Sequence, residues 1–83
     1  MKLNAVVIAL AALSQDSRLE VFRMLVRSGV DGLSAGEIAE RLRIPAPTLS
    51  FHLNQLRHAG LVHFRRDGRS LIYATNYDAM NAL

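Results

Sequence analysis

Two sets of polar side chains in the second half of the chain have the chemistry that binding to double-stranded DNA requires. The first set, between residues 47 and 58, consists of hydroxyl, amide and imidazole groups at successive turns of a predicted helix. Amide and hydroxyl groups on a helix can pair with base edges in the major groove. The second set consists of Arg66 and Arg69, which flank the dipeptide Asp67-Gly68. Arginines on a protruding hairpin can reach phosphates or the minor groove.

The helix that carries the first set, here called the recognition helix, is predicted to span residues 47–59 and to end at Gly60. Leu49, Leu53 and Leu56 follow one another at i, i+4 and i+7, so they define its buried side. The opposite side then presents Pro47, Thr48, Ser50, Phe51, Asn54, Gln55 and His58. An ordinary solvated helix face explains any one of these residues more easily than it explains the whole set.

A shorter helix is predicted directly before the recognition helix. Ser34 and Glu37 have the spacing of a capping box, which starts a helix that reaches Leu42. Pro45 and Pro47 suit the first turn of a helix but not its interior, so the chain must turn between residues 43 and 46. The two helices together form a helix-turn-helix.

A β-hairpin, here called the wing, is predicted after the recognition helix. Residues 61–66 and 70–75 alternate apolar and polar side chains around Asp67-Gly68, a strong hairpin signal. Val62, Phe64, Tyr73 and one of Leu71 or Ile72 are expected to pack inward. The wing arginines could also serve only to protect an edge strand from pairing with another chain.

The N-terminal part is predicted to be scaffold and dimer interface. Residues 3–13 are apolar on almost every side, so this helix needs more apolar cover than one small domain can supply. Asp16 or Ser17 should cap the next helix, which ends at Gly29 and turns Leu19, Phe22, Leu25 and Val26 inward. A last helix should start near residue 77 and be incomplete at Leu83. The expected dimer interface consists of Leu3, Val6, Val7, Leu10, Met80 and Leu83.

Length, charge and cysteine content set the remaining limits. Eighty-three residues fit one domain, residues 1–83. Residues 41–69 hold six arginines against one aspartate, so the positive charge gathers on the predicted DNA-binding part, as contact with phosphates requires. The chain has no cysteine, which excludes disulfides and thiolate sites within it and is compatible with a reducing cytoplasm. The apolar run at residues 5–13 is too short to cross a bilayer.

Five segments together resemble the ArsR/SmtB family of winged-helix repressors: Asp16–Leu19, Leu33–Leu42, Pro47–Leu53, Leu56–Val62 and Asp67–Tyr73. The resemblance covers nearly the whole chain, and its C-terminal part is most similar to the arsenite-responsive branch. It implies a mainly α fold with a small β-hairpin (α+β): a winged helix-turn-helix of four helices, two strands and a fifth helix, joined as a homodimer through the first and last helices. It also implies a double-stranded operator of two inverted half-sites and release from it by an inducer.

The resemblance carries over to individual positions of this sequence. With the residues that the helical spacing and the hairpin supply, the predicted DNA-binding set is Pro47, Thr48, Ser50, Phe51, His52, Asn54, Gln55, Arg57, Arg66 and Arg69. His52 lies near the edge of the buried stripe, so a phosphate contact and a hydrogen bond inside the fold are both open. Phe51 departs from the family pattern, in which a basic or polar residue is common.

The family's sensing sites are not matched. Ser34 and Gly36 stand where its thiolate site lies, and Tyr77 and Ala79 stand at its carboxylate and imidazole positions, so no metal site is expected. The three histidines lack the i, i+4 spacing and the acidic partner of a zinc site. Arsenite or antimonite could act as inducer only if cysteines follow Leu83, and no other cofactor is expected.

The sequence thus predicts a cytoplasmic transcriptional repressor that binds operator DNA and no membrane, and the resemblance implies a role in arsenic resistance. The alternative is a winged-helix module that binds protein and reads no DNA sequence. An enzyme is not expected, because no catalytic set of cysteine, paired carboxylates, phosphate-binding glycines or Ser-His-Asp is apparent.

Overall fold

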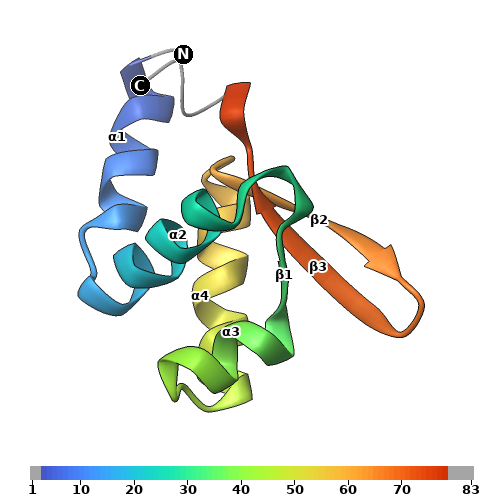
Figure 1. The fold of residues 1–83 in the computed structure, drawn as a ribbon. Coiled ribbons are helices and arrows are strands. Elements are labelled where there is room, and N and C mark those ends of the chain that lie inside the picture. Colours follow the sequence, from blue (N-terminus) through green and yellow to red (C-terminus); the bar gives the residue numbers. More distant parts are fainter. Residues whose placement is uncertain (1–2, 79–83) are drawn as a thin grey trace.

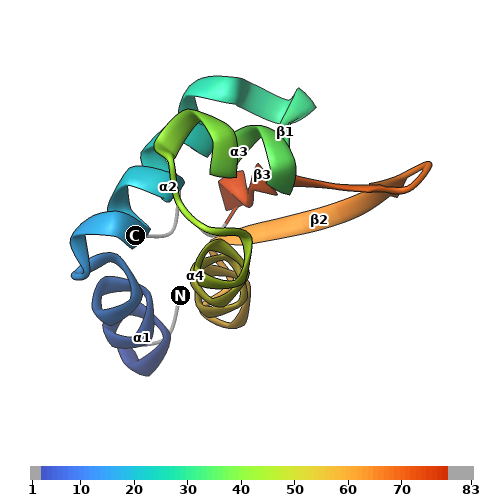
Figure 2. The ribbon, with the colours of Figure 1, turned by 90° about the horizontal axis from the view of Figure 1, so that it is seen from below.

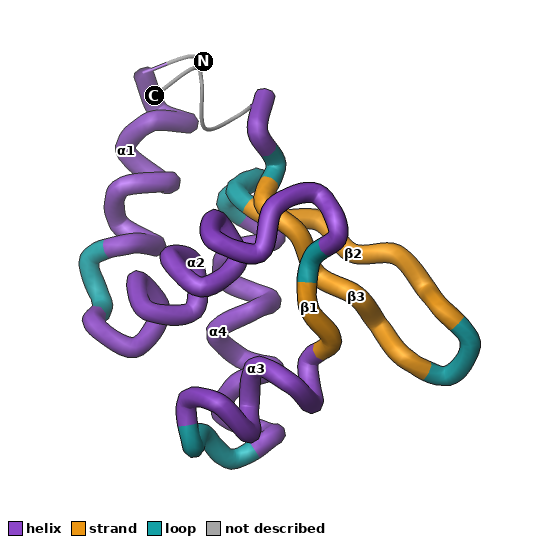
Figure 3. Tube along the Cα trace, in the orientation of Figure 1, coloured by secondary structure: helices purple, strands orange, loops and turns teal. Residues whose placement is uncertain are grey.

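The computed structural model describes residues 3–78, and their elements follow one another as four α-helices, one short 3-10 helix and three strands (Figures 1 and 3). The predicted winged helix-turn-helix architecture is confirmed, although the sheet has one strand more than expected. The elements are α1 (Leu3–Leu13), α2 (Asp16–Ser28), η1 (Gly29–Asp31), β1 (Leu33–Ser34), α3 (Ala35–Leu42), α4 (Ala46–His58), β2 (Val62–Asp67) and β3 (Ser70–Thr75).

The core lies where α2, α3 and α4 meet the inner end of the sheet. Leu49, Leu53 and Leu56 of α4 are buried as their spacing predicted, and Leu25 of α2 and Ile38 of α3 are fully covered beside them. Burying one such side chain stabilises the fold by roughly 1.5 to 3 kcal/mol. The buried stripe therefore fixes which side of α4 remains open to a partner.

Helix α2 differs from the prediction at its start and on one face. Gln15, not Asp16 or Ser17, caps it, because the Gln15 side-chain oxygen accepts a hydrogen bond from the Arg18 backbone N–H at 2.9 Å. Leu19 was expected inside but is exposed, and Val21 takes its place in the core. The rest of the predicted stripe is confirmed, because Phe22 and Leu25 are buried and Val26 is partly buried against the core.

The two helices of the helix-turn-helix start close to where they were expected. The capping box of α3 is confirmed: Ser34 Oγ accepts from the Glu37 N–H at 3.1 Å, and Glu37 Oε1 accepts from the Ser34 N–H at 3.5 Å. Helix α4 starts at Ala46, one residue early, with Pro45 as its N-cap. Gly60 follows it with φ +78°, a conformation that glycine adopts without strain.

The sheet has the order β1-β3-β2, with both pairings antiparallel. Strand β1 was not predicted, because two residues are too few to show an alternating pattern. It pairs Leu33 with Tyr73 and Ser34 with Ile72, which ties the start of α3 to the hairpin. Gly32, just before β1, has φ +72° and lies so close that a Cβ atom there would be 2.3 Å from the Tyr73 carbonyl oxygen.

The tip of the wing lies one residue further along than predicted. Asp67 pairs with Ser70, so the two-residue loop is Gly68-Arg69 rather than Asp67-Gly68. Gly68 has φ +63° and Arg69 has no positive φ, the pattern of a hairpin turn with glycine at its first position. Phe64 was expected to pack inward but remains partly exposed, in contact with Tyr73 at a ring distance of 5.6 Å.

Helix α1 buries only a narrow stripe of small residues, Ala9 and Ala12. Leu3, Val7 and Leu10 of the predicted dimer interface are 81%, 56% and 57% exposed, whereas Val6 is partly buried. Met80 and Leu83, the other two predicted interface residues, lie outside the described residues, as does most of the predicted last helix. The described residues 3–78 therefore leave a long apolar surface of α1 open.

Candidate nucleic-acid interface

The recognition helix and the wing project from the same part of the molecule. In Figure 1 the turn between α3 and α4 lies at the lower end, and the tip of the β2-β3 hairpin extends beyond the helices. Figure 2 looks nearly along α4 and shows the hairpin reaching out sideways from it. A duplex that contacts the exposed side of α4 with its groove can therefore meet the wing with its backbone or an adjacent groove.

The exposed side of α4 carries most of the predicted DNA-binding residues. Asn54 projects from its middle, Gln55 is half-buried, and Arg57 lies beside the wing. The remaining predicted residues that the structure leaves exposed on this helix are Pro47, Thr48, Ser50 and Phe51. The helix thus offers hydroxyl and amide groups to a partner while its leucines remain covered.

His52 lies apart from this set. Its side chain is 6% exposed, so the prediction that it contacts DNA is corrected: His52 occupies a buried position near Arg18 of α2. Burial, together with the nearby positive charge of Arg18, lowers the pKa of His52 below its ordinary value. Its Nδ1 has no hydrogen-bond partner within residues 3–78. A neutral imidazole is the form that such a position favours.

This burial predicts that stability falls at mildly acid pH. The pKa of His52 is 6.5 in an ordinary setting and lower in the folded protein, so below that pH the unfolded chain binds a proton that the folded chain resists. The stability that depends on a neutral His52 is complete above pH 6.5. It is lost as the pH falls from 6.5 through the folded-state pKa, by at most about 1.4 kcal/mol per pH unit. Urea unfolding at several pH values measures it.

A matched pair of variants isolates this effect. His52→Gln should remove part of the slope, whereas His58→Gln, an exposed histidine on the same helix, should keep it. Equal slopes in the two variants would show that another group titrates.

Two arginine–aromatic contacts, which the sequence did not predict, hold the recognition helix on both sides. The Arg57 guanidinium lies 5.0 Å from the ring centre of Phe64 on β2, and the Arg18 guanidinium of α2 lies 5.7 Å from the ring centre of Phe51. Such contacts contribute about 0.5 to 1 kcal/mol at exposed sites. Arg57 therefore connects the recognition helix to the wing. The contact with Arg18 gives a structural reason for the phenylalanine at position 51, where the family commonly has a basic or polar residue.

The arginines of residues 41–69 differ in their surroundings. Arg66 and Arg69 are exposed near the wing tip, whereas Arg65 donates a hydrogen bond to the Asp31 carbonyl oxygen at 3.0 Å. The one ion pair among residues 3–78 joins Arg41 to Glu37 at 3.8 Å. Most of the positive charge on the helix-turn-helix and wing is thus free of carboxylate partners within the described part of the chain.

Arg43 is a candidate site residue that sequence reasoning missed. It ends α3 in the left-handed conformation, with φ 55°, where glycine is the usual residue, and its side chain is exposed in the turn before α4. Position and charge make it a further candidate for a phosphate contact. No sequence pattern showed that the backbone bends in this way at an arginine.

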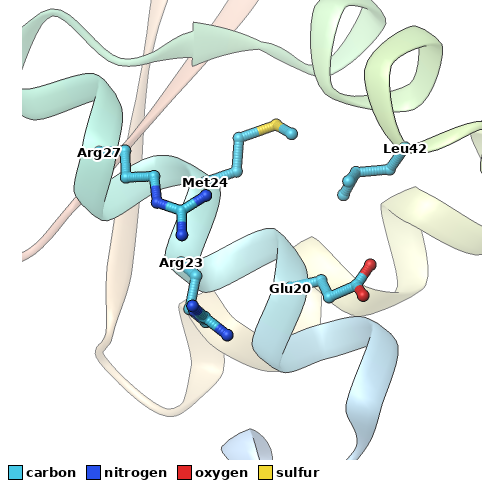
Figure 4. A pocket seen from close by; sticks show the side chains of 5 residues that line it. All are labelled: Glu20, Arg23, Met24, Arg27 and Leu42. Carbon is cyan, nitrogen blue, oxygen red and sulfur yellow. The ribbon is translucent and has the colours of Figure 1, made fainter.

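The remaining surface features give less support for a functional site. A hollow of about 280 Å³ lies beside α2 and the end of α3. Figure 4 shows the five side chains that line it: Glu20, Arg23, Met24, Arg27 and Leu42. Its charged side chains are all exposed. No group of three or more acidic or histidine side chains within residues 3–78 is placed to hold a metal ion. None of the described helices is long and apolar enough to cross a membrane.

Comparisons with known proteins agree with this geometry. The profile of the helix-turn-helix domain matches residues 13–64. The chain is 46% identical over 59 residues to the uncharacterized HTH-type transcriptional regulator YceK of Bacillus subtilis, covering 71% of this chain and 58% of that protein. It is 32% identical over 77 residues to the transcriptional activator HlyU of Vibrio cholerae, covering 93% of this chain and 68% of that protein. The chain thus spans little more than half of YceK.

Two solved structures share the whole described fold. One is the homodimeric winged helix-turn-helix DNA-binding domain of Mb0332 from Mycobacterium bovis, a possible ArsR-family transcriptional regulator. It has a TM-score of 0.84 and 26% identity and covers 96% of this chain and 72% of that chain. The other is the transcriptional repressor BigR from Xylella fastidiosa, with a TM-score of 0.79 and 32% identity, covering 95% of this chain and 79% of that chain.

Proposed function

Because the chain belongs to the ArsR/SmtB family of winged helix-turn-helix transcriptional regulators, we propose that it is a repressor that binds an inverted-repeat operator as a homodimer. The observation that carries the proposal is the exposed hydroxyl and amide face of α4 beside a wing whose Arg66 and Arg69 have no carboxylate partner among residues 3–78. Base contacts from the helix supply specificity, and phosphate contacts from the wing supply affinity that depends on salt. The residues proposed to contact DNA are the predicted DNA-binding set without His52 and with Arg43 added.

The homodimer is proposed to form through α1. Leu3, Val7 and Leu10 are exposed on it, and an apolar surface of this kind is typical of an interface. The DNA-binding domain of Mb0332, which shares the fold, is homodimeric. Two copies of α4 related by a twofold axis would contact two inverted half-sites, which accounts for the proposed operator symmetry.

Repression is favoured over activation because it requires only that the dimer occupies its operator. Among the relatives, BigR is a transcriptional repressor, whereas HlyU is a transcriptional activator. The proposal includes residues 1–83 as one domain and a cytoplasmic location, where such a regulator meets the DNA. Arsenite or antimonite is proposed as inducer only on condition that thiolates come from outside this cysteine-free sequence.

The test compares a base-facing residue with a phosphate-facing one, on a duplex selected from a random pool. Asn54→Ala should lose roughly 1 to 3 kcal/mol of binding free energy, mainly at particular base pairs. Arg66→Ala should weaken binding to every duplex and lower the slope of log K against log salt by about one. Fluorescence anisotropy over a series of salt concentrations measures both effects.

Arg27→Ala is the matched control, because Arg27 is exposed on the outer side of α2, away from α4 and the wing. It should change neither quantity. A protein that binds selected and scrambled duplexes equally would instead be the alternative, a winged-helix module that binds protein. Loss of the same size for Asn54→Ala on every duplex would show that the base-reading face is misplaced.

A further inference from the structure

A second hollow lies between α1 and the C-terminal half of α4. Its volume is about 300 Å³, the lower end of the range of small-molecule sites. Ile8, Ala11, Ala12 and Ala59 form apolar walls. Ile8 is 54% exposed and belongs neither to the core nor to the predicted dimer interface.

The polar side of this hollow carries positive charge without a counter-ion. Arg18, Gln55 and His58 complete the lining, which contains no acidic residue among those described. Arg18 is partly buried, and its Nε is fully covered with no hydrogen-bond acceptor within residues 3–78. Its Nη1 makes one long bond, 3.4 Å, to the Ala12 carbonyl oxygen. A covered guanidinium nitrogen without an acceptor is unusual in folded proteins, and a bound anion would satisfy it.

We propose that this hollow, here called the α1-α4 site, binds a small organic carboxylate, with the carboxylate on Arg18 and the hydrocarbon part against Ile8, Ala11 and Ala59. A guanidinium binds a carboxylate in a planar, two-point arrangement. The single guanidinium suits one negative charge, and the apolar walls suit a hydrocarbon body better than they suit a phosphate. The site is therefore chemically distinct from any thiolate sensor.

The α1-α4 site shares residues and contacts with the DNA-binding face. Gln55 of α4 lines the hollow and also belongs to the predicted DNA-binding residues. Arg18 of α2 packs over Phe51, which is likewise a residue of α4. A carboxylate bound to Arg18 would compete for these groups, so it should weaken operator binding. This second step rests on the proposed function, whereas ligand binding itself does not.

The experiment titrates phenylacetate into the unmutated protein without DNA, followed by calorimetry and by the chemical shifts of the α4 amides. Saturable binding is expected with a Kd on the order of 1 mM or tighter, as is usual for a fragment of this size. Phenylacetamide, which has the same shape without the charge, should bind at least about tenfold more weakly. Acetate, which lacks the apolar body, should also bind more weakly.

Two variants and one matched control locate the site. Arg18→Gln should lose most of the affinity for phenylacetate, whereas Arg23→Gln, an exposed arginine on the same helix, should keep it. Because Arg18→Gln removes a contact between helices, Ala11→Phe provides a second variant. Ala11 is exposed, so a phenyl ring there fills the hollow from outside without entering the core.

Each outcome decides a separate point. Equal binding of phenylacetate and phenylacetamide, or retained binding in Ala11→Phe, would overturn the site. Binding that leaves operator affinity unchanged would overturn the regulatory step alone. A protein that binds phenylacetate but no DNA would count against the proposed function and leave the site standing. Failure of phenylacetate to bind, with Arg18→Gln lowering the salt slope for DNA by about one, would assign Arg18 to a phosphate contact instead.

Discussion

Gly32→Ala is expected to leave the protein largely unfolded at room temperature. A Cβ atom at this position would lie 2.3 Å from the Tyr73 carbonyl oxygen and 3.1 Å from its carbonyl carbon, both backbone atoms held in the central strand. The backbone of Gly32, with φ 72° and ψ −168°, is also one that only glycine adopts easily. We expect a loss above about 4 kcal/mol, comparable to the whole stability of a domain of this size.

Gly29→Ala distinguishes the effect of the collision with Tyr73 from the effect of backbone strain on stability. Gly29 has nearly the same backbone angles, φ 71° and ψ −157°, but a Cβ atom there would meet nothing within 4 Å. Both variants carry the strain, roughly 1 to 3 kcal/mol, and only Gly32→Ala adds the collision. Urea unfolding followed by circular dichroism should show a folded Gly29→Ala protein. Similar stability of the two variants would mean that β1 and β3 are not this close.

Val7→Glu is expected to dissociate the dimer and to lower operator affinity by two orders of magnitude or more. Val7 is 56% exposed at the centre of the apolar side of α1, so the substitution puts a charge into the proposed interface but not into the core of the monomer. Two half-site contacts made by one dimer commonly exceed a single contact by about 100-fold to 10,000-fold. Sedimentation and operator titration should therefore change together.

Val30→Glu is the control for Val7→Glu. Val30 is 75% exposed in η1, outside α1, so a glutamate there adds the same charge away from the proposed interface. It should leave both association and DNA binding nearly unchanged. A folded monomer at micromolar concentration in the unmutated chain would remove the basis of the interface.

The elements that the sequence predicted well are those with strong local signals. Ser34 and Glu37 form the capping box, Gly60 ends α4, and the leucine stripe of α4 is buried, because each depends on neighbours within a few residues. The two-residue strand β1 depends instead on Tyr73 and Ile72, about forty positions away, so no local pattern could show it. Leu19 was misplaced because an apolar residue type alone does not decide which helix face is covered.

In the candidate site too, local spacing predicted some positions correctly, whereas tertiary packing decided others. Helical periodicity placed Thr48, Ser50 and Asn54 on the open side of α4, and the structure exposes them there. Periodicity also left His52 at the edge of the stripe, and only the packing of α2 and the nearby Arg18 decide that it is buried. The contacts of Arg18 with Ala12 and Phe51 join three helices, an arrangement that depends on how the helices cross.

The two roles of Ser34 restrict which residues evolution can accept at this position. It is the last residue of β1, paired with Ile72, and at the same time the N-cap of α3. Ser, Thr, Asp and Asn all cap helices well, but Asp and Asn are disfavoured in strands, whereas Thr is favoured there. Threonine is therefore the replacement that natural variants should show most often, and alanine or glycine should be rare, even though the side chain makes no proposed contact with DNA.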